Sequence, residues 1–296
     1  MSTPTYRLGL VLVTASAVAW STAGLFSRLI SVDSWTLVAW RGMFGALGVL
    51  LVIAALQRRG VMAQFRQLGW KGWLMAANGA IGMTFFVTAL RHTSVAHVAV
   101  IYATVPFTAA AAGWLMLREA PARDAVVASL AALAGVVVMV GFGTDGGWFG
   151  DLLAFGMTIS MATFMVMARA YPQIPAMPAA CLSALLSGLV ALPMSTSGAL
   201  TPWDLLLLAL FGLTNSAAGL ALFTLGARHL PAIETALIGS LDAPLAPLWV
   251  FLAFGEVPGA STLAGGAIVF VAVVAHIVVG SLRADAGSGV PSVLGE

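Results

Sequence analysis

The sequence predicts an all-α integral membrane protein in which ten transmembrane helices form two inverted five-helix repeats. Three observations support this prediction: an apolar composition, apolar segments of membrane-spanning length, and a second half that matches the first in register. Of the 296 residues, 60% are hydrophobic and 8% are charged, and the mean hydropathy is +1.02. Soluble domains carry about 25% charged residues. We therefore expect the chain to lie in a lipid bilayer.

Short polar or turn-forming junctions separate the apolar segments, each close to the ~20 residues that cross a bilayer as a helix. In the first half these segments cover residues 8–30, 35–56, 70–90, 95–117 and 124–142. In the second half they cover residues 149–170, 176–194, 203–227, 232–254 and 261–282. We expect residues 1–143 to form the first repeat and residues 144–282 the second. The Gly/Ser-rich stretch 283–296 is predicted to be a disordered cytoplasmic tail.

The second half repeats the first at a constant offset, which aligns Arg228 with Arg91 (228 − 91 = 137). Polar and turn-forming residues recur at this offset without a gap. The matched pairs are Asn78 and Asn215, Gly82 and Gly219, Phe86 and Phe223, His92 and His229, Ile101 and Ile238, Glu119 and Glu256, and Pro121 and Pro258. Because each copy holds an odd number of spans, the second copy must enter the membrane inverted. Inverted repeats are typical of secondary transporters, whose site lies between the repeats.

The basic residues predict the orientation of the chain, because cytoplasmic junctions retain Lys and Arg. With the N-terminus inside, ten of the 13 basic residues fall on the inner side and three on or near the outer side. Both termini are therefore expected in the cytoplasm. The second copy agrees with its inversion, since Gly255 and Ala260 stand where the first copy has Arg118 and Arg123.

The sequence lacks the motifs of several other function classes. No G-x-x-x-x-G-K-[ST] phosphate loop is present, and the single lysine, Lys71, lies in "LGWKGW". There is no H-E-x-x-H, no G-x-S-x-G and no Cys/His cluster, so neither an enzyme nor a cofactor is predicted. The basic residues are scattered, which disfavours nucleic-acid binding. A channel is an alternative, although isolated polar residues do not form the continuous stripe that a pore needs.

Four stretches resemble the motifs of a known family. "VAWSTAGLFSR" (18–28) is similar to its first-span signature, and Arg41 in "LVAWRGMFGAL" to its second-span arginine. "VPFTAAAAGWLMLREAP" and "LDAPLAPLWVFLAFGEVP" are similar to its paired Pro-rich spans. On these motifs the chain resembles the drug/metabolite transporter (DMT) superfamily of EamA type, and within it the YddG-like exporters of aromatic and other amino acids. Val105 stands where YddG-like members have an aromatic residue before the fourth-span proline.

The resemblance implies a secondary transporter that exports amino acids and related small metabolites across a bacterial inner membrane. Export would proceed by alternating access through a central cavity, without a cofactor. A drug or sugar-type metabolite exporter of the same fold is the alternative substrate class, and a channel is the alternative mechanism. The choices between uniport and proton coupling, and between a monomer and a larger assembly, stay open.

Ionisable residues inside the spans are candidates for transport, because a charge in a bilayer is costly. Asp242 lies near mid-depth in "GSLDAPLAPLW". It is either a cavity carboxylate that meets a substrate ammonium or a proton, or a buried acid bonded to its neighbours. Glu234 and His97 occupy equivalent positions (234 − 137 = 97) at opposite faces. Each is either a cavity residue or an interfacial group that reaches toward water.

Prolines occur in two matching spans, Pro106 in the fourth and Pro244 and Pro247 in the ninth. A proline inside a helix frees the carbonyl group four residues before it. Helices broken at matching places in two repeats are typical of a transport site. A static kink that only shapes packing is the alternative interpretation.

Four further residues complete the predicted cavity. Asn78 and Asn215, the repeat-related amides, either bind a substrate carboxylate or join helices by hydrogen bonds. Trp20 and Tyr102 could stack on an aromatic substrate. Arg41 is expected to act structurally, through a helix end or an acid.

Overall fold

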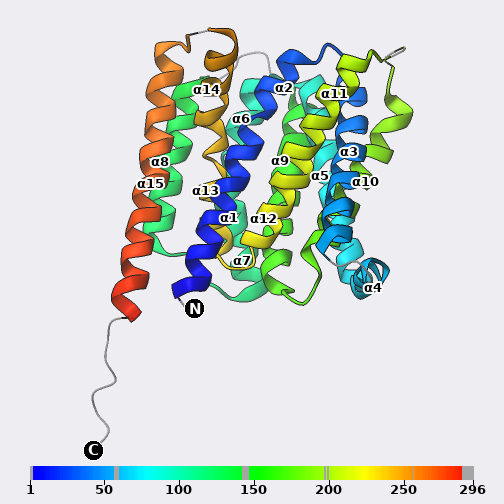
Figure 1. Ribbon diagram of the computed structural model, residues 1–296. Helices are drawn as coiled ribbons and strands as arrows, with labels where there is room; N and C mark the ends of the chain where they lie inside the picture. Colours follow the sequence, from blue (N-terminus) through cyan, green and yellow to red (C-terminus); the bar gives the residue numbers. More distant parts are fainter. Residues whose placement is uncertain are drawn as a thin grey trace, which may run out of the picture.

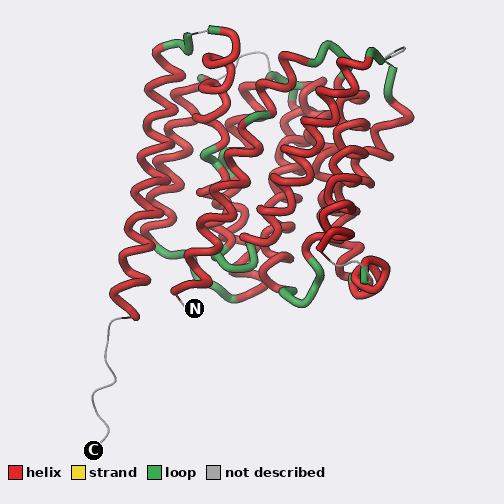
Figure 2. The backbone as a smooth tube through the Cα atoms, viewed as in Figure 1, coloured by secondary structure: helices red, strands yellow, loops and turns green. Residues whose placement is uncertain are grey.

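The computed structural model describes residues 3–56, 60–141, 147–196, 198, 200–255 and 257–288. Within these ranges every regular element is a helix, and most of the helices run side by side in one bundle, as Figure 1 and Figure 2 show. Ten spans, formed by single helices or by helices joined end to end, are long and apolar enough to cross a membrane. The prediction of an all-α protein with ten spans is confirmed.

The first repeat comprises helices α1 to α8. Their bounds are α1 (Thr3–Ser21), α2 (Ala23–Leu29), α3 (Ser34–Leu56), α4 (Val61–Gln67), α5 (Gly69–His92), α6 (Val95–Tyr102), α7 (Val105–Leu117) and α8 (Arg123–Val140). α1 and α2 together form the first span, and α6 and α7 form the fourth. The short helix α4 lies crosswise at one end of the bundle (Figure 1).

The second repeat comprises α9 to α15. Its elements are α9 (Trp148–Ala170), α10 (Ala176–Ala191), the 3-10 turn η1 (Leu192–Met194), α11 (Pro202–Phe211), the π-helix η2 (Gly212–Leu220), α12 (Ala221–Gly226), α13 (Ala232–Gly239), α14 (Asp242–Phe254) and α15 (Ala260–Ser288). α15 includes residues 283–288, which the sequence assigned to a tail, because the good helix formers Arg and Ala in "RADAGS" extend it. The rest of the expected tail, residues 289–296, lies outside the described residues.

Helix boundaries repeat at the same offset as the sequence. α6 begins at residue 95 and α13 at 232, α7 at 105 and α14 at 242, and α8 at 123 and α15 at 260, which is 137 each time. The residues that follow α7 and α14 also correspond, and both are left-handed, with φ 58° at Arg118 and φ 69° at Gly255. The duplication therefore extends from residue types to backbone conformation.

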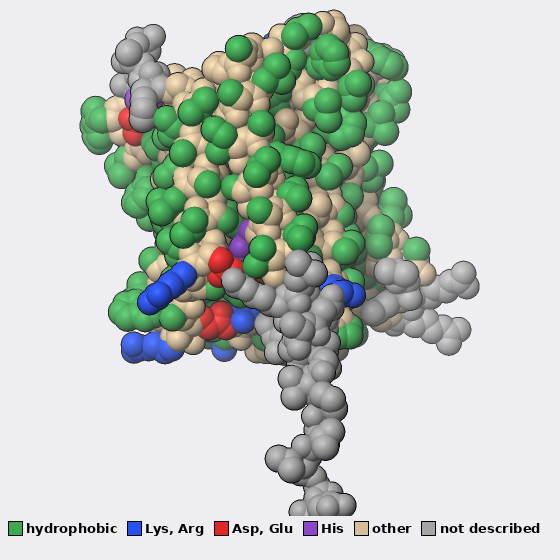
Figure 3. Space-filling model, turned by 90° about the vertical axis from the view of Figure 1, so that its left-hand side faces the viewer, with side chains coloured by type: hydrophobic (Ala, Val, Ile, Leu, Met, Phe, Trp, Pro, Cys, Tyr) green, Lys and Arg blue, Asp and Glu red, His purple; other side chains and the backbone are tan. Residues whose placement is uncertain are grey.

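The two repeats begin at opposite ends of the bundle. α1 starts beside the N-terminus at the lower end of Figure 1, α9 starts at the upper end, and α15 returns the chain to the lower end. The repeats are thus inverted, as predicted. Basic side chains gather at the lower end of the face in Figure 3.

Two arginines cross-link the junctions near the lower end. Arg169 at the end of α9 forms a bidentate ion pair with Glu119, with 2.7 Å between Nη2 and Oε1. Arg228 donates hydrogen bonds to the backbone carbonyls of Pro172 and Ile174. Burial lowers the pKa of the Arg228 guanidinium from its usual value. These bonds attach the junctions after the fourth and eighth spans to the end of the sixth span and the junction that follows it.

Glycines bring helices of different repeats into backbone contact. A Cβ atom at Gly42 of α3 would lie 2.6 Å from the carbonyl oxygen of Ala184 in α10, and Gly188 of α10 faces the backbone of α3 as closely. α8 and α15 approach each other in the same way through Gly135 and Gly265. Small residues serve this purpose in membranes, where lipid tails provide no hydrophobic force between helices.

Candidate functional site

The fourth and ninth spans are each broken near the middle, so that Tyr102 ends α6 and Asp242 begins α14. Pro106 is the second residue of α7 and Pro244 the third residue of α14. Proline is tolerated in the first turn of a helix but cannot donate the bond that would continue the preceding one. Pro247 lies inside α14, which continues through it.

Tyr102 and Asp242 bring a phenol and a carboxylate from different repeats to these breaks. Both side chains are half-buried, and the carboxylate of Asp242 acts electrostatically on Tyr102. Asp242 also interacts with the backbone N–H of Ala243 and stands at the positive end of the α14 dipole. A carboxylate in this position can bind a cationic group, and the phenol beside it can donate a hydrogen bond or stack on a ring.

The two broken spans pack tightly at one end only. α13 packs against α7, and seven of its eight residues, all but Gly239, are buried. Repeat symmetry would place α6 against α14 in the same way. Among the described residues these two helices make no comparable contact, and α14 has no buried residue. The spans are therefore closed at the α7–α13 end, the lower end in Figure 1, and separated at the α6–α14 end.

Trp20 is held in place between the first and eighth spans. Its indole donates a hydrogen bond of 3.1 Å to the backbone carbonyl of Asn215, and its ring centroid lies 4.7 Å from that of Phe223. A Cβ atom at Gly219 would lie 2.6 Å from the indole, so only glycine leaves room for the ring. Asn215 and Gly219 belong to η2, and π-helical turns displace backbone groups from their usual register.

The repeat-related amides Asn78 and Asn215 both form bonds between helices. Asn215 is buried and accepts a hydrogen bond of 2.8 Å from Nη1 of Arg41, which is also buried. Asn78 donates a hydrogen bond of 2.8 Å to the backbone carbonyl of Ser160. The first bond joins the second and eighth spans, and the second joins the third and sixth. Of the two roles considered for these amides, the structure shows the joining of helices.

His97 and Glu234 lie in equivalent contacts at opposite ends of the bundle. Nδ1 of His97 lies 3.1 Å from both carboxylate oxygens of Asp151 on α9. Glu234 accepts a hydrogen bond of 2.8 Å from the hydroxyl of Tyr6 on α1. In each case the first span of one repeat contacts the first half of the broken span of the other. The seven polar and aromatic candidates thus fall into separate groups, and Tyr102 and Asp242 form the group at the breaks.

Sequence reasoning missed four residues that contact or surround these candidates: Tyr6, Asp124, Asp151 and His276. His276 carried the clearest signal, because it is the single ionisable residue in the apolar segment from 261 to 282. The other three stand near helix ends, where polar residues are ordinary. Only the folded structure indicates that they matter.

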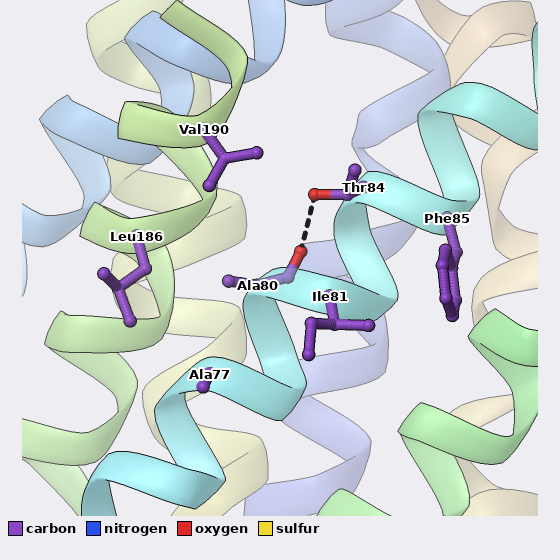
Figure 4. Close-up of a pocket in the computed structure, with 7 residues that line it drawn as sticks. All are labelled: Ala77, Ala80, Ile81, Thr84, Phe85, Leu186 and Val190. Carbon is purple, nitrogen blue, oxygen red and sulfur yellow. Dashed lines mark hydrogen bonds between the residues drawn. The ribbon is translucent and has the colours of Figure 1, made fainter.

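Two apolar cavities open on the sides of the bundle, and neither is lined by Tyr102 or Asp242. The first, of about 370 Å³, lies between α5 and α10. Figure 4 shows its seven lining residues, among which the Thr84 hydroxyl is already bonded to the carbonyl of Ala80 at 2.9 Å. The second, of about 530 Å³, lies between α14 and α15 and is lined by Pro244 and Pro247. Each lining contains a single polar side chain, Thr84 or Thr262, so neither cavity suits a charged substrate.

Inverted repeats whose broken spans meet at the repeat interface define the class of this protein, which is that of membrane transporters. The chain belongs to the EamA-like transporter family, whose model matches residues 7–141 and again residues 148–278. The family points to a transporter and not to an enzyme.

One solved structure, described only as "Crystal structure of protein", is similar to this chain with a TM-score of 0.80. The alignment covers 92% of this chain and 98% of that chain. At 18% identity the likeness concerns the fold alone. No curated protein matches the chain at a significant level.

Proposed function

We propose that this protein exports amino acids and related small metabolites across a bacterial inner membrane by alternating access. The observation that carries the proposal is the pair of equivalent helix breaks, which brings Tyr102 and Asp242 from opposite repeats to the middle of the bundle. Discontinuous helices at a repeat interface are typical of transporter binding sites. The polar cavity residues are accordingly Tyr102 and Asp242, and Trp20 is the aromatic candidate of the first span.

The chemistry of the site suits an amino acid. The carboxylate of Asp242 can pair with a substrate ammonium, while the positive end of the α7 dipole favours a substrate carboxylate. Tyr102 provides one aromatic face. Val105, in place of an aromatic residue, favours a broad substrate range over strict aromatic selectivity.

The uneven packing of the two broken spans supports alternating access. With the basic lower end and both termini in the cytoplasm, the closed α7–α13 end faces inward and the separated α6–α14 end faces outward. This arrangement corresponds to an outward-open state. If α6 packed against α14 and α7 separated from α13, the result would be the inward-open state, because the repeats are equivalent.

Transport by the purified protein in proteoliposomes tests this function. We expect saturable uptake of radiolabelled amino acids, measured with and without an imposed pH gradient. Asp242→Asn should reduce the flux about tenfold or more, because a neutral amide cannot replace an ionic bond to the substrate ammonium. Asp204→Asn is the matched control, since Asp204 is a half-buried carboxylate in the capping box of α11 and not at the breaks.

Three outcomes would count against parts of the proposal. Flux of drugs or sugars without any amino-acid flux would establish the other substrate class. Flux that rises linearly without saturation would indicate a channel. An equal loss of flux in Asp242→Asn and Asp204→Asn would mean that Asp242 does not bind the substrate.

A further inference from the structure

His276 on α15 is a buried polar residue that the proposed transport site does not use. Its side chain is 2% exposed, and neither ring nitrogen has a hydrogen-bond partner among the described residues. Buried polar groups are almost always bonded, since an unbonded one loses the water it had in the unfolded chain. This exception calls for a physical explanation.

A carboxylate lies close to each ring nitrogen of His276. Nε2 is 3.8 Å from an oxygen of Glu234 on α13, and Nδ1 is 4.0 Å from an oxygen of Asp124 on α8. A neutral imidazole carries a proton on one nitrogen only, so its other nitrogen would present a lone pair to a carboxylate. The doubly protonated ring presents an N–H group to both acids.

Four helices pack on α15, and three of them bring titratable groups to His276. α8 contributes Asp124, α13 contributes Glu234, and α1 contributes Tyr6 through its bond to Glu234. The one titratable residue of α14, Asp242, stands at the start of that helix. No set of three or more His, Cys, Asp or Glu residues in the described part of the chain could hold a metal ion. A proton is therefore the cation that this arrangement suits.

Exposure decreases stepwise from water to His276. The side chain of Asp124 is 30% exposed in the first turn of α8, that of Glu234 is 11% exposed, and that of His276 is 2% exposed. Figure 3 shows a histidine beside acidic side chains just above the basic lower end. Asp124 can thus take a proton from water and pass it inward to the imidazole.

We propose that His276, Asp124 and Glu234 form a proton-binding site that controls the opening of the lower end of the transporter. When the proton is bound, the imidazolium attracts both carboxylates and ties α13 to α15 and α8. When the proton leaves through Asp124, two carboxylates remain near a neutral ring, and α13 loses this attachment. Closure is therefore favoured at low pH and lost as the pH rises, within the range of about pH 5 to 8 in which histidine changes charge.

The first test follows protonation directly by NMR of the full-length protein with ¹⁵N-labelled histidine. His276→Gln identifies the signal, and His92, which packs on Phe149 with no acid partner in that contact, is the internal reference. We expect the two ring-nitrogen signals of His276 to change with pH between pH 8 and pH 5, and Asp124→Asn to alter that pH dependence, because it removes the carboxylate that faces Nδ1. A ring that stays neutral throughout, or a pH dependence that Asp124→Asn leaves unchanged, would overturn the proposal.

The second test measures opening, with Ile238→Cys on α13 as a reporter in a Cys181→Ala background. Labelling of the reporter by a water-soluble thiol reagent should increase several-fold from pH 6 to pH 8, and His276→Gln should abolish this pH dependence. Dependence that survives in His276→Gln would refute the role of the site.

The inference rests on the proposed function, because a proton site that controls opening is useful only to a transporter. Neither test uses a substrate, so both results could still be interpreted if the protein did not transport amino acids.

Discussion

At the residue scale, Asn215 and Asn78 occupy equivalent positions in the two repeats but form different hydrogen bonds. Asn215 is the hydrogen-bond acceptor of the buried Arg41 guanidinium, whereas Asn78 donates to a neutral backbone carbonyl. A hydrogen bond to a charged group contributes about 1.5–3 kcal/mol. Bonds between neutral groups of membrane helices average about 0.6 kcal/mol.

Replacement of these two amides should therefore affect stability unequally. We expect Asn215→Ala to lower the free energy of unfolding by about 2 kcal/mol, because it leaves Arg41 buried without that acceptor. Asn78→Ala should cost about 0.6 kcal/mol. Reversible unfolding in mixed micelles measures both values. Equal losses would mean that Arg41 finds another partner.

The composition of the site was only partly predictable at this scale. Asp242 and Tyr102 could be selected because they are polar residues near the middle of apolar spans. Their separation from His97 and Glu234 could not be predicted, because helical spacing within a span does not reveal which other spans it faces. His276 illustrates the same limit, since its acid partners belong to α8 and α13.

At the element scale, neighbouring glycines of α15 differ in what surrounds them. A Cβ atom at Gly265 would collide with the carbonyl oxygen of Gly135 and lie 2.5 Å from the backbone nitrogen of Met139, both on α8. A Cβ atom at Gly266 would lie 3.4 Å from the Cβ of Pro244, an ordinary contact. Of these two glycines of α15, only Gly265 is required for the close approach to α8.

The substitutions Gly265→Ala and Gly266→Ala form a matched pair, because both improve helix propensity by about 1 kcal/mol. We expect Gly265→Ala to destabilise the protein by about 2 kcal/mol, since α8 and α15 must move apart. Gly266→Ala should be neutral or slightly stabilising. Unfolding midpoints in detergent distinguish them, and a stable Gly265→Ala would show that this helix pair can separate at little cost.

Helix boundaries were the most predictable elements, because the residues that begin or end a helix act on the local backbone, as Ser94, Pro231 and Gly255 do here. The segments 95–117 and 232–254 match the ends of the fourth and ninth spans residue for residue. The break at Thr22 was not predictable, since it contains no proline and the hydroxyls of Ser21 and Thr22 compete with the helix by bonding to backbone carbonyls. The π-helix η2 likewise has no distinctive composition.

At the scale of the whole molecule, the separated and closed ends predict different access from water. In a Cys181→Ala background, a cysteine replacing half-buried Tyr102 at the end of α6 should react with a water-soluble thiol reagent added outside. A cysteine replacing Ile238, which is 0% exposed on α13, should stay protected at low pH. Mass spectrometry of the labelled protein measures both. The reverse pattern would indicate an inward-open molecule.

Arg118 has a consequence for how such a chain could be built. It holds a left-handed conformation that Gly255 adopts freely in the other copy, and a side chain there costs about 1 kcal/mol. The arginine gives the first repeat a positive charge at this junction, and the second repeat has none at the equivalent position. If both residues were glycine and both repeats were identical, this position would no longer determine which repeat has the junction on the cytoplasmic side. The product of one five-helix gene could then insert into the membrane in both orientations, and two such chains could assemble into the same architecture.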